Sequence, residues 1–77
     1  MAVEDTVKEI LLEILEVDEK DIVPKAHLIK DLSASSVDLV EIMAAVENEF
    51  DMDIPDEDAP EIRTVQALMD YIKKKTS

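Results

Sequence analysis

DLSASSVDLVEIMAAVENEF, residues 31–50, is the stretch that decides the fold. At about 100° per residue, its apolar residues divide into two stripes along a helix. The broad stripe is typical of a face that packs on a core and consists of Leu39, Ile42, Met43, Val46 and Phe50. The narrow stripe points away from the first and consists of Val37, Val40 and Ala44, with Glu41, Glu47 and Asn48 along its borders. A lone globular domain does not need the second stripe, so we interpret it as a candidate docking surface.

The start of this helix is predicted from its capping chemistry. Ser35 is a suitable N-cap, and Asp38, three residues later, completes an aspartate version of the capping box. Ser36 is then the first helical residue, and its hydroxyl points outward. From the pattern alone, Ser33, Ser35 and Ser36 are equally well explained as ordinary residues of a helix start.

The same stretch resembles the second helix of the acyl carrier protein family, whose members usually read Asp-Leu-Gly-Ala-Asp-Ser-Leu-Asp at its start. Ser36 matches the serine that is modified in that family, and IPDEDAPEIRTVQALMDYI at 54–72 is similar to the family's third and fourth helices. The resemblance implies a covalent 4′-phosphopantetheine arm on Ser36, whose thiol holds acyl groups as thioesters in fatty acid or related polyketide-type biosynthesis. It also implies that an acyl chain slides between the second and third helices, beside positions that match Val46, Ile54, Ile62, Leu68 and Ile72.

The resemblance further implies which proteins this chain meets. A phosphopantetheinyl transferase would modify Ser36, and acyl-transferring and chain-elongating enzymes would dock through basic patches. The docking residues that match are Ser35, Val37, Asp38, Val40, Glu41, Ala44, Glu47 and Asn48. No basic residue lies near Ser36 in sequence to activate its hydroxyl, so we expect catalysis to belong to the partners and this chain not to be an enzyme.

Three positions depart from the usual motif of the family. Ser33 stands where Gly is common, Ser35 where Asp is nearly always found, and Val37 where Leu is usual. Serine caps a helix about as well as aspartate does, so we expect the fold to be kept. The missing negative charge beside Ser36 supports an alternative function, that of an unmodified carrier-like protein-interaction module.

Composition sets the class of the protein. With 77 residues and no Cys, the chain is predicted to form one domain, residues 1–77, without disulfides or thiolate metal sites. It shows no leader and no apolar run of membrane-spanning length, so we expect it in the cytoplasm. We also expect a monomer. The net charge is −12, and the eleven acidic residues from Asp31 to Glu61 are accompanied by no Lys or Arg. Such a field repels nucleic acid and anionic lipid and steers basic proteins, so neither nucleic acid nor membrane is an expected partner.

The chain before residue 36 is predicted to form one helix and a long loop. Apolar residues at three- and four-residue spacing predict an amphipathic helix over Val3–Glu16, with Lys8 pairing with Glu4. The periodicity fails from Val17 to Ser35, which we interpret as a connecting loop. His27 is the sole histidine and has no Cys beside it, so we interpret it as a surface loop residue rather than a metal ligand or a base.

The acid-dense segment DMDIPDEDAP, residues 51–60, suggests a second alternative, an acidic calcium-responsive helical protein. The pattern of a calcium loop is not met, because Pro55 occupies a ligand position and the chain has no Gly. Asp56 is predicted to cap a short helical turn that runs to about Ile62 and is cramped by Pro60, and Thr64 to cap a last helix over Val65–Lys74. The predicted fold is therefore all-α, a four-helix bundle with a short third helix and a long loop between helices one and two.

Overall fold

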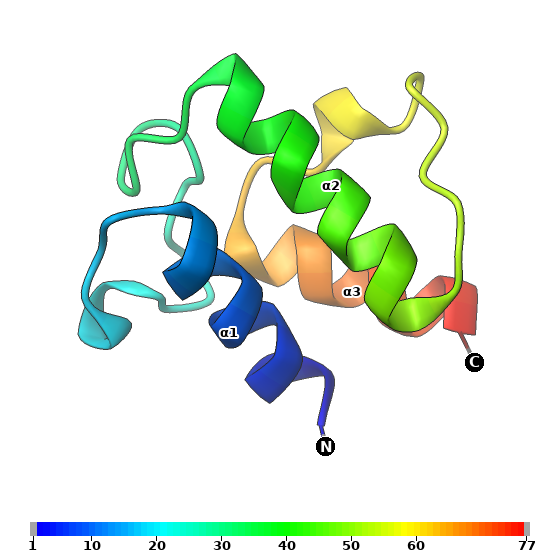
Figure 1. The fold of residues 1–77 in the computed structure, drawn as a ribbon, viewed down its shortest axis with the longest axis horizontal. Coiled ribbons are helices and arrows are strands. Elements are labelled where there is room, and N and C mark those ends of the chain that lie inside the picture. Colours follow the sequence, from blue (N-terminus) through cyan, green and yellow to red (C-terminus); the bar gives the residue numbers. More distant parts are fainter. Residues whose placement is uncertain (1, 77) are drawn as a thin grey trace.

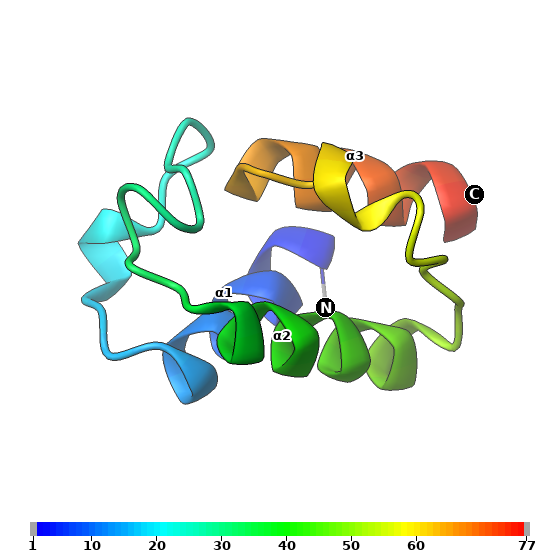
Figure 2. The ribbon, with the colours of Figure 1, turned by 90° about the horizontal axis from the view of Figure 1, so that it is seen from above.

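The computed structural model describes residues 2–76, so the two ends of the predicted domain, residues 1 and 77, lie outside the described residues. Three α-helices are present in this part of the chain: α1 (Val3–Ile14), α2 (Ser36–Phe50) and α3 (Val65–Thr76). Two single turns of 3-10 helix, η1 (Glu19–Asp21) and η2 (Ala59–Glu61), lie in the two connections (Figure 1). Helix α1 packs against both α2 and α3, and Figure 2 shows α2 and α3 on opposite sides of the molecule.

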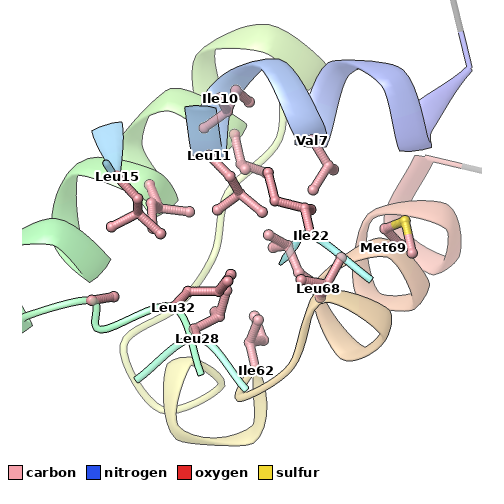
Figure 3. Close-up of a cluster of buried hydrophobic side chains, with 14 of the residues drawn as sticks. Val7, Ile10, Leu11, Leu15, Ile22, Leu28, Leu32, Ile62, Leu68 and Met69 are labelled. Carbon is pink, nitrogen blue, oxygen red and sulfur yellow. The ribbon is translucent and has the colours of Figure 1, made fainter. Parts of the chain in front are cut away.

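The core is built by the helices and by both connections. The buried apolar residues of the helices are Val7, Ile10, Leu11, Ile42, Val46, Val65, Leu68, Met69 and Ile72. Those of the connections are Leu15, Ile22, Ala26, Leu28, Leu32, Ala34, Ile54 and Ile62. Figure 3 shows Leu28, Leu32 and Ile62 reaching into the same interior as Leu11 of α1. The long connection between α1 and α2 therefore packs on the core as a helix would, although it contains no α-helix.

Helix α1 confirms the predicted amphipathic helix, although it ends at Ile14 rather than at Glu16. The predicted pair between Lys8 and Glu4 is wrong. Glu4 instead accepts a hydrogen bond from Lys73 Nζ of α3 at 2.6 Å, and Lys8 lies 3.8 Å from Glu19. The bond from Lys73 lowers the pKa of the Glu4 carboxyl below its usual range. Sequence spacing predicts only neighbours on one helix, whereas the fold brings a lysine of another helix closer.

The connection between α1 and α2 is fixed to the start of α3 by backbone hydrogen bonds. The N–H of Leu28 donates to the carbonyl of Arg63 at 2.8 Å, and the N–H of Val65 donates to the carbonyl of Ala26 at 3.0 Å. His27 is half-buried rather than a plain surface residue. Its Nδ1 accepts hydrogen bonds from two backbone N–H groups of the following turn, at 3.2 and 3.1 Å, so the ring stabilises this loop.

The predicted short third helix is not an α-helix. Where a short helical turn was predicted from Asp56 to about Ile62, the chain forms the three-residue 3-10 turn η2, Ala59–Glu61. Pro60 lies in the middle of that turn and has no N–H to continue a helical pattern. Asp56 contributes its backbone carbonyl, which accepts from the N–H of Ala59 at 3.3 Å, and no side-chain cap. Within residues 2–76 the predicted four-helix bundle is therefore an all-helical fold with three α-helices.

Helix α3 confirms the prediction for the last helix. Thr64 Oγ1 accepts from the N–H of Ala67 at 3.1 Å, as an N-cap does. The four residues predicted to face inward are all buried: Val65, Leu68, Met69 and Ile72. The helix continues to Thr76, two residues beyond the predicted end at Lys74. No helix in residues 2–76 combines the length and the apolar character needed to cross a membrane.

Candidate functional site

The start of α2 is held by the capping box that the sequence predicts. Ser35 Oγ accepts a hydrogen bond from the N–H of Asp38 at 3.1 Å. In return, Asp38 Oδ2 accepts from the N–H of Ser35 at 3.0 Å. Both side chains are used in this exchange, so the first turn of the helix is fixed and the next residue, Ser36, keeps a defined direction.

Ser36 is exposed and is the first residue of α2. Its own N–H and that of Val37 have no acceptor within the helix, because they belong to the first turn. Those two donors and the positive end of the helix dipole favour an anion beside the serine hydroxyl. An exposed hydroxyl next to such donors fits a serine that is esterified to a phosphate group.

The loop before α2 positions this serine from both sides. Leu32 and Ala34 are buried and anchor the loop to the core. Ser33 lies between them with a φ of 58°, in the left-handed region. Its N–H donates to the carbonyl of Ile29 at 3.1 Å. The sharp turn at Ser33 lets the two neighbouring side chains point inward while residues 35 and 36 emerge at the surface.

The narrow apolar stripe of α2 is exposed. Val37 and Val40 keep 67% and 69% of their surface in contact with solvent, and Ala44 is also exposed. Large apolar side chains are seldom left so open without a binding role when they cluster. Of the polar border residues, Glu41 and Asn48 are exposed, whereas Glu47 is half-buried and its Oε2 accepts from the N–H of Ile54 at 2.8 Å.

A groove of about 240 Å³ runs between α2 and the segment 54–62; we call it the first groove. Two of the predicted acyl-chain positions, Ile54 and Ile62, line it. The other three, Val46, Leu68 and Ile72, are 0% exposed in the core and do not line it. Its remaining lining residues are Leu39, Val40, Met43, Ala44, Glu47, Asp56 and Ala59.

The sequence did not assign Leu39 and Met43 to this groove, because periodicity places them on the core stripe. Both are half-buried, whereas Ile42 and Val46 of the same stripe are fully buried. For Met43 a signal was available, because at about 100° per residue it lies at the edge of the stripe nearest to Val40, where a side chain reaches both the core and the groove. Leu39 lies in the middle of the stripe, and helical periodicity does not separate it from the core residues.

The sequence of this chain was compared with models of known protein families. Residues 5–72 match the family model described as the phosphopantetheine attachment site. The chain belongs to this family. Carrier domains of this family are the sites of covalently attached 4′-phosphopantetheine, and they interact with phosphopantetheinyl transferases and with partner enzymes. The match begins within α1, ends within α3, and includes the whole of α2 with its capped start.

The segment 54–62 of this carrier domain is also attached to α3. Tyr71 donates a hydrogen bond from its hydroxyl to Asp58 Oδ2 at 2.7 Å. Burial and this bond raise the pKa of Tyr71 to about 12. Together with the bond from Ile54 to Glu47, it fixes the wall of the first groove to two different helices.

The acidic segment does not gather its carboxylates. Among residues 2–76, no group of three acidic, His or Cys side chains is close enough to hold a metal ion. Asp58 faces Tyr71, and Asp53 and Asp56 are exposed. The described residues therefore give no geometric support to the alternative of an acidic calcium-responsive protein.

Proposed function

We propose that this carrier domain is an acyl carrier protein in fatty acid or related polyketide-type biosynthesis, with its 4′-phosphopantetheine on Ser36. The observation that carries the proposal is the position of Ser36, which is exposed at the first residue of α2 beside an intact capping box. The arm supplies a thiol that can hold an acyl group as a thioester, and this chain contains no Cys of its own.

The carrier itself contributes the attachment site for the arm rather than catalytic groups. In the described residues, no basic side chain is hydrogen-bonded to the Ser36 hydroxyl, so the base that activates it must come from a transferase. Once a phosphate is attached, the outward N–H groups of Ser36 and Val37 lie on its side of the helix and favour its charge. The protein's task is then to present the arm to its partner enzymes.

Docking of partner enzymes is assigned to the exposed face of α2. Val37, Val40 and Ala44 supply a small apolar contact, and Glu41 and Asn48 border it. The net charge of −12 attracts enzymes with basic patches and raises their rate of encounter. A small contact area keeps the complexes weak enough to release, as a carrier that visits several enzymes in succession requires. We propose that the carrier is monomeric between visits and works in the cytoplasm.

The first groove is assigned to the acyl chain. It begins at Leu39, one helical turn beyond Ser36, and its floor is apolar. Leu39, Met43, Ile54 and Ile62 would cover the chain and shield it from water.

The test is the intact mass of the carrier after incubation with coenzyme A and several phosphopantetheinyl transferases. We expect a gain of one phosphopantetheine in the wild type and none in Ser36→Ala. Ser33→Ala is the matched control, because it removes a neighbouring exposed hydroxyl and leaves the proposed site intact. Both variants should melt cooperatively. Modification of Ser36→Ala would show that the site is wrong.

One second function is favoured by a specific residue. Ser35 replaces the acidic residue that usually precedes the modified serine in acyl carrier proteins, and this supports an interaction module that uses the α2 face without an arm. If no transferase modifies the folded wild type, while a basic partner still binds the α2 face, this second function replaces the first.

A further inference from the structure

A second groove, of about 400 Å³, adjoins the first one. Leu39, Ala59 and Ile62 line both, so the two grooves meet at these residues. From there the second groove runs between the turn at residues 27–30 and the chain at residues 59–63. Its volume lies within the range of small-molecule sites. A chain that enters beside Leu39 can therefore follow either of two directions.

The two grooves differ in charge. The first is bordered by Glu47 and Asp56. The second has no acidic residue in its lining and carries three side chains with nitrogen donors, namely His27, Lys30 and Arg63. In a protein with twenty acidic and eight basic residues, this local excess of basic groups is the opposite of the overall pattern.

Two of these donors are held in place by the fold. His27 Nδ1 accepts two backbone hydrogen bonds, so in the neutral ring the proton is on Nε2, which becomes the free donor. Arg63 Nε donates to the carbonyl of Pro60 at 2.8 Å, which anchors the guanidinium group and leaves its terminal N–H groups for another acceptor. The Lys30 ammonium adds a second positive charge on the opposite wall.

We infer that the second groove binds the free carboxylate of an acyl cargo whose far end is acidic, carried on the arm at Ser36. The apolar residues Ile29, Leu39 and Ile62 would cover its methylene groups, and Arg63 and Lys30 would bind its carboxylate. An acyl chain that ends in a methyl group gains no binding energy from these cations, and it can lie in the first groove instead. The inference rests on the proposed function, since it needs a cargo tethered at Ser36.

A test that does not depend on any transferase uses the absence of cysteine from the chain. Ser36→Cys provides a unique thiol, to which two synthetic arms of equal length are coupled, one ending in a carboxylate and the other in a methyl group. Neither arm contains a phosphate. We expect the carboxylate form to melt about 4–8 °C above the methyl form, as one net charge-assisted contact would give in a domain of this size. Backbone amide signals of residues 27–30 and 63 should shift only in the carboxylate form.

The difference should disappear in the double variant Lys30→Gln/Arg63→Gln. It should persist in the matched control Lys20→Gln/Lys25→Gln, which removes the same charge from two exposed lysines outside the groove. Equal melting of the two arms, or a difference that survives without Lys30 and Arg63, would overturn the inference.

The phosphate of the natural arm is the other anion that these cations could bind. The enzymatically modified carrier, without cargo, is therefore compared in the same two double variants. One outcome is that the substitution of Lys30 and Arg63 lowers the melting temperature of the cargo-free modified carrier while the carboxylate arm melts no higher than the methyl arm. In that case the groove binds the phosphate, and the cargo inference is wrong. Failure of every transferase to modify Ser36 would count against the proposed function alone, because the chemically coupled arms are still measured.

Discussion

Replacing Ser33 by glycine should make the carrier more stable. Ser33 has a φ of 58°, in the left-handed region where a side chain crowds the following carbonyl. The turn cannot relax, because Leu32 and Ala34 on either side are buried in the core. The N–H groups of Ser33 and Ala34 also donate to the carbonyls of Ile29 and Leu28, at 3.1 and 2.9 Å. The strain therefore belongs to the folded state and is removed only when the side chain is removed.

The magnitude follows from two opposing terms. A non-glycine residue in the left-handed region costs ~1–2 kcal/mol. Glycine adds conformational freedom to the unfolded chain, which reduces the gain by ~0.5–1 kcal/mol. The Ser33 side chain is exposed and makes no hydrogen bond in the described part of the chain, so nothing else is lost. We expect Ser33→Gly to raise the free energy of unfolding by ~0.5–1 kcal/mol, which corresponds to about 2–8 °C in melting temperature.

The assay is a set of thermal and urea melts of the wild type, Ser33→Gly and Ser33→Ala. Alanine keeps the β-carbon and hence the strain, so it should melt at or slightly below the wild type. The urea midpoint of the glycine variant should rise with an unchanged slope, which indicates a change of stability alone. A glycine variant that melts no higher than the alanine variant would refute the account of a strained turn.

Three further predictions concern charge. Ser35→Asp should keep the N-cap and speed modification by a general transferase, and equal rates for the two proteins at low salt would show that this departure is harmless. Tyr71 is the sole tyrosine, so an ultraviolet titration should report its pKa near 12 in the wild type and closer to its usual ~10 in Asp58→Asn. Because folding raises that pKa, the protonated Tyr71 hydroxyl contributes to the free energy of unfolding below pH ~10, and this contribution is lost as the pH rises through about 12. Added monovalent salt should raise the melting temperature by screening repulsion among the acidic residues, and a melting temperature independent of salt would contradict this.

The sequence predicts those parts of the fold that depend on neighbours along the chain. The capping box of Ser35 and Asp38 is a contact over three residues, and both of its hydrogen bonds are present. The inward face of α3 follows from helical periodicity in the same way. Neither the capping box nor the inward face of α3 depends on which elements pack together. A local sequence pattern is therefore sufficient to predict both.

Contacts between distant residues could not be predicted in this way. Periodicity offered Lys8 as the partner of Glu4, and the fold supplied Lys73. The same limit applies to the candidate site, since the second groove joins residues 27–30 to Arg63 across more than thirty positions of sequence. The short third helix has a local limit that the sequence does show, because Pro60 allows one turn but has no N–H to continue a longer helix.

The acidic residues of the predicted docking set on α2 differ in whether their carboxylates already accept a hydrogen bond. This difference reduces the number of charges that a partner can use. Asp38 and Glu47 lie within the predicted set, yet each carboxylate already accepts a backbone N–H, one at the start of the helix and the other from Ile54 of the groove wall. A partner's lysine would have to compete with these bonds. Glu41 is exposed and makes no hydrogen bond or ion pair in the described residues, so its charge is available at little cost to the fold. We therefore expect recognition by basic enzymes to depend mainly on Glu41 beside Val37 and Val40. Asp38 and Glu47 hold the start of α2 and the wall of the first groove in place.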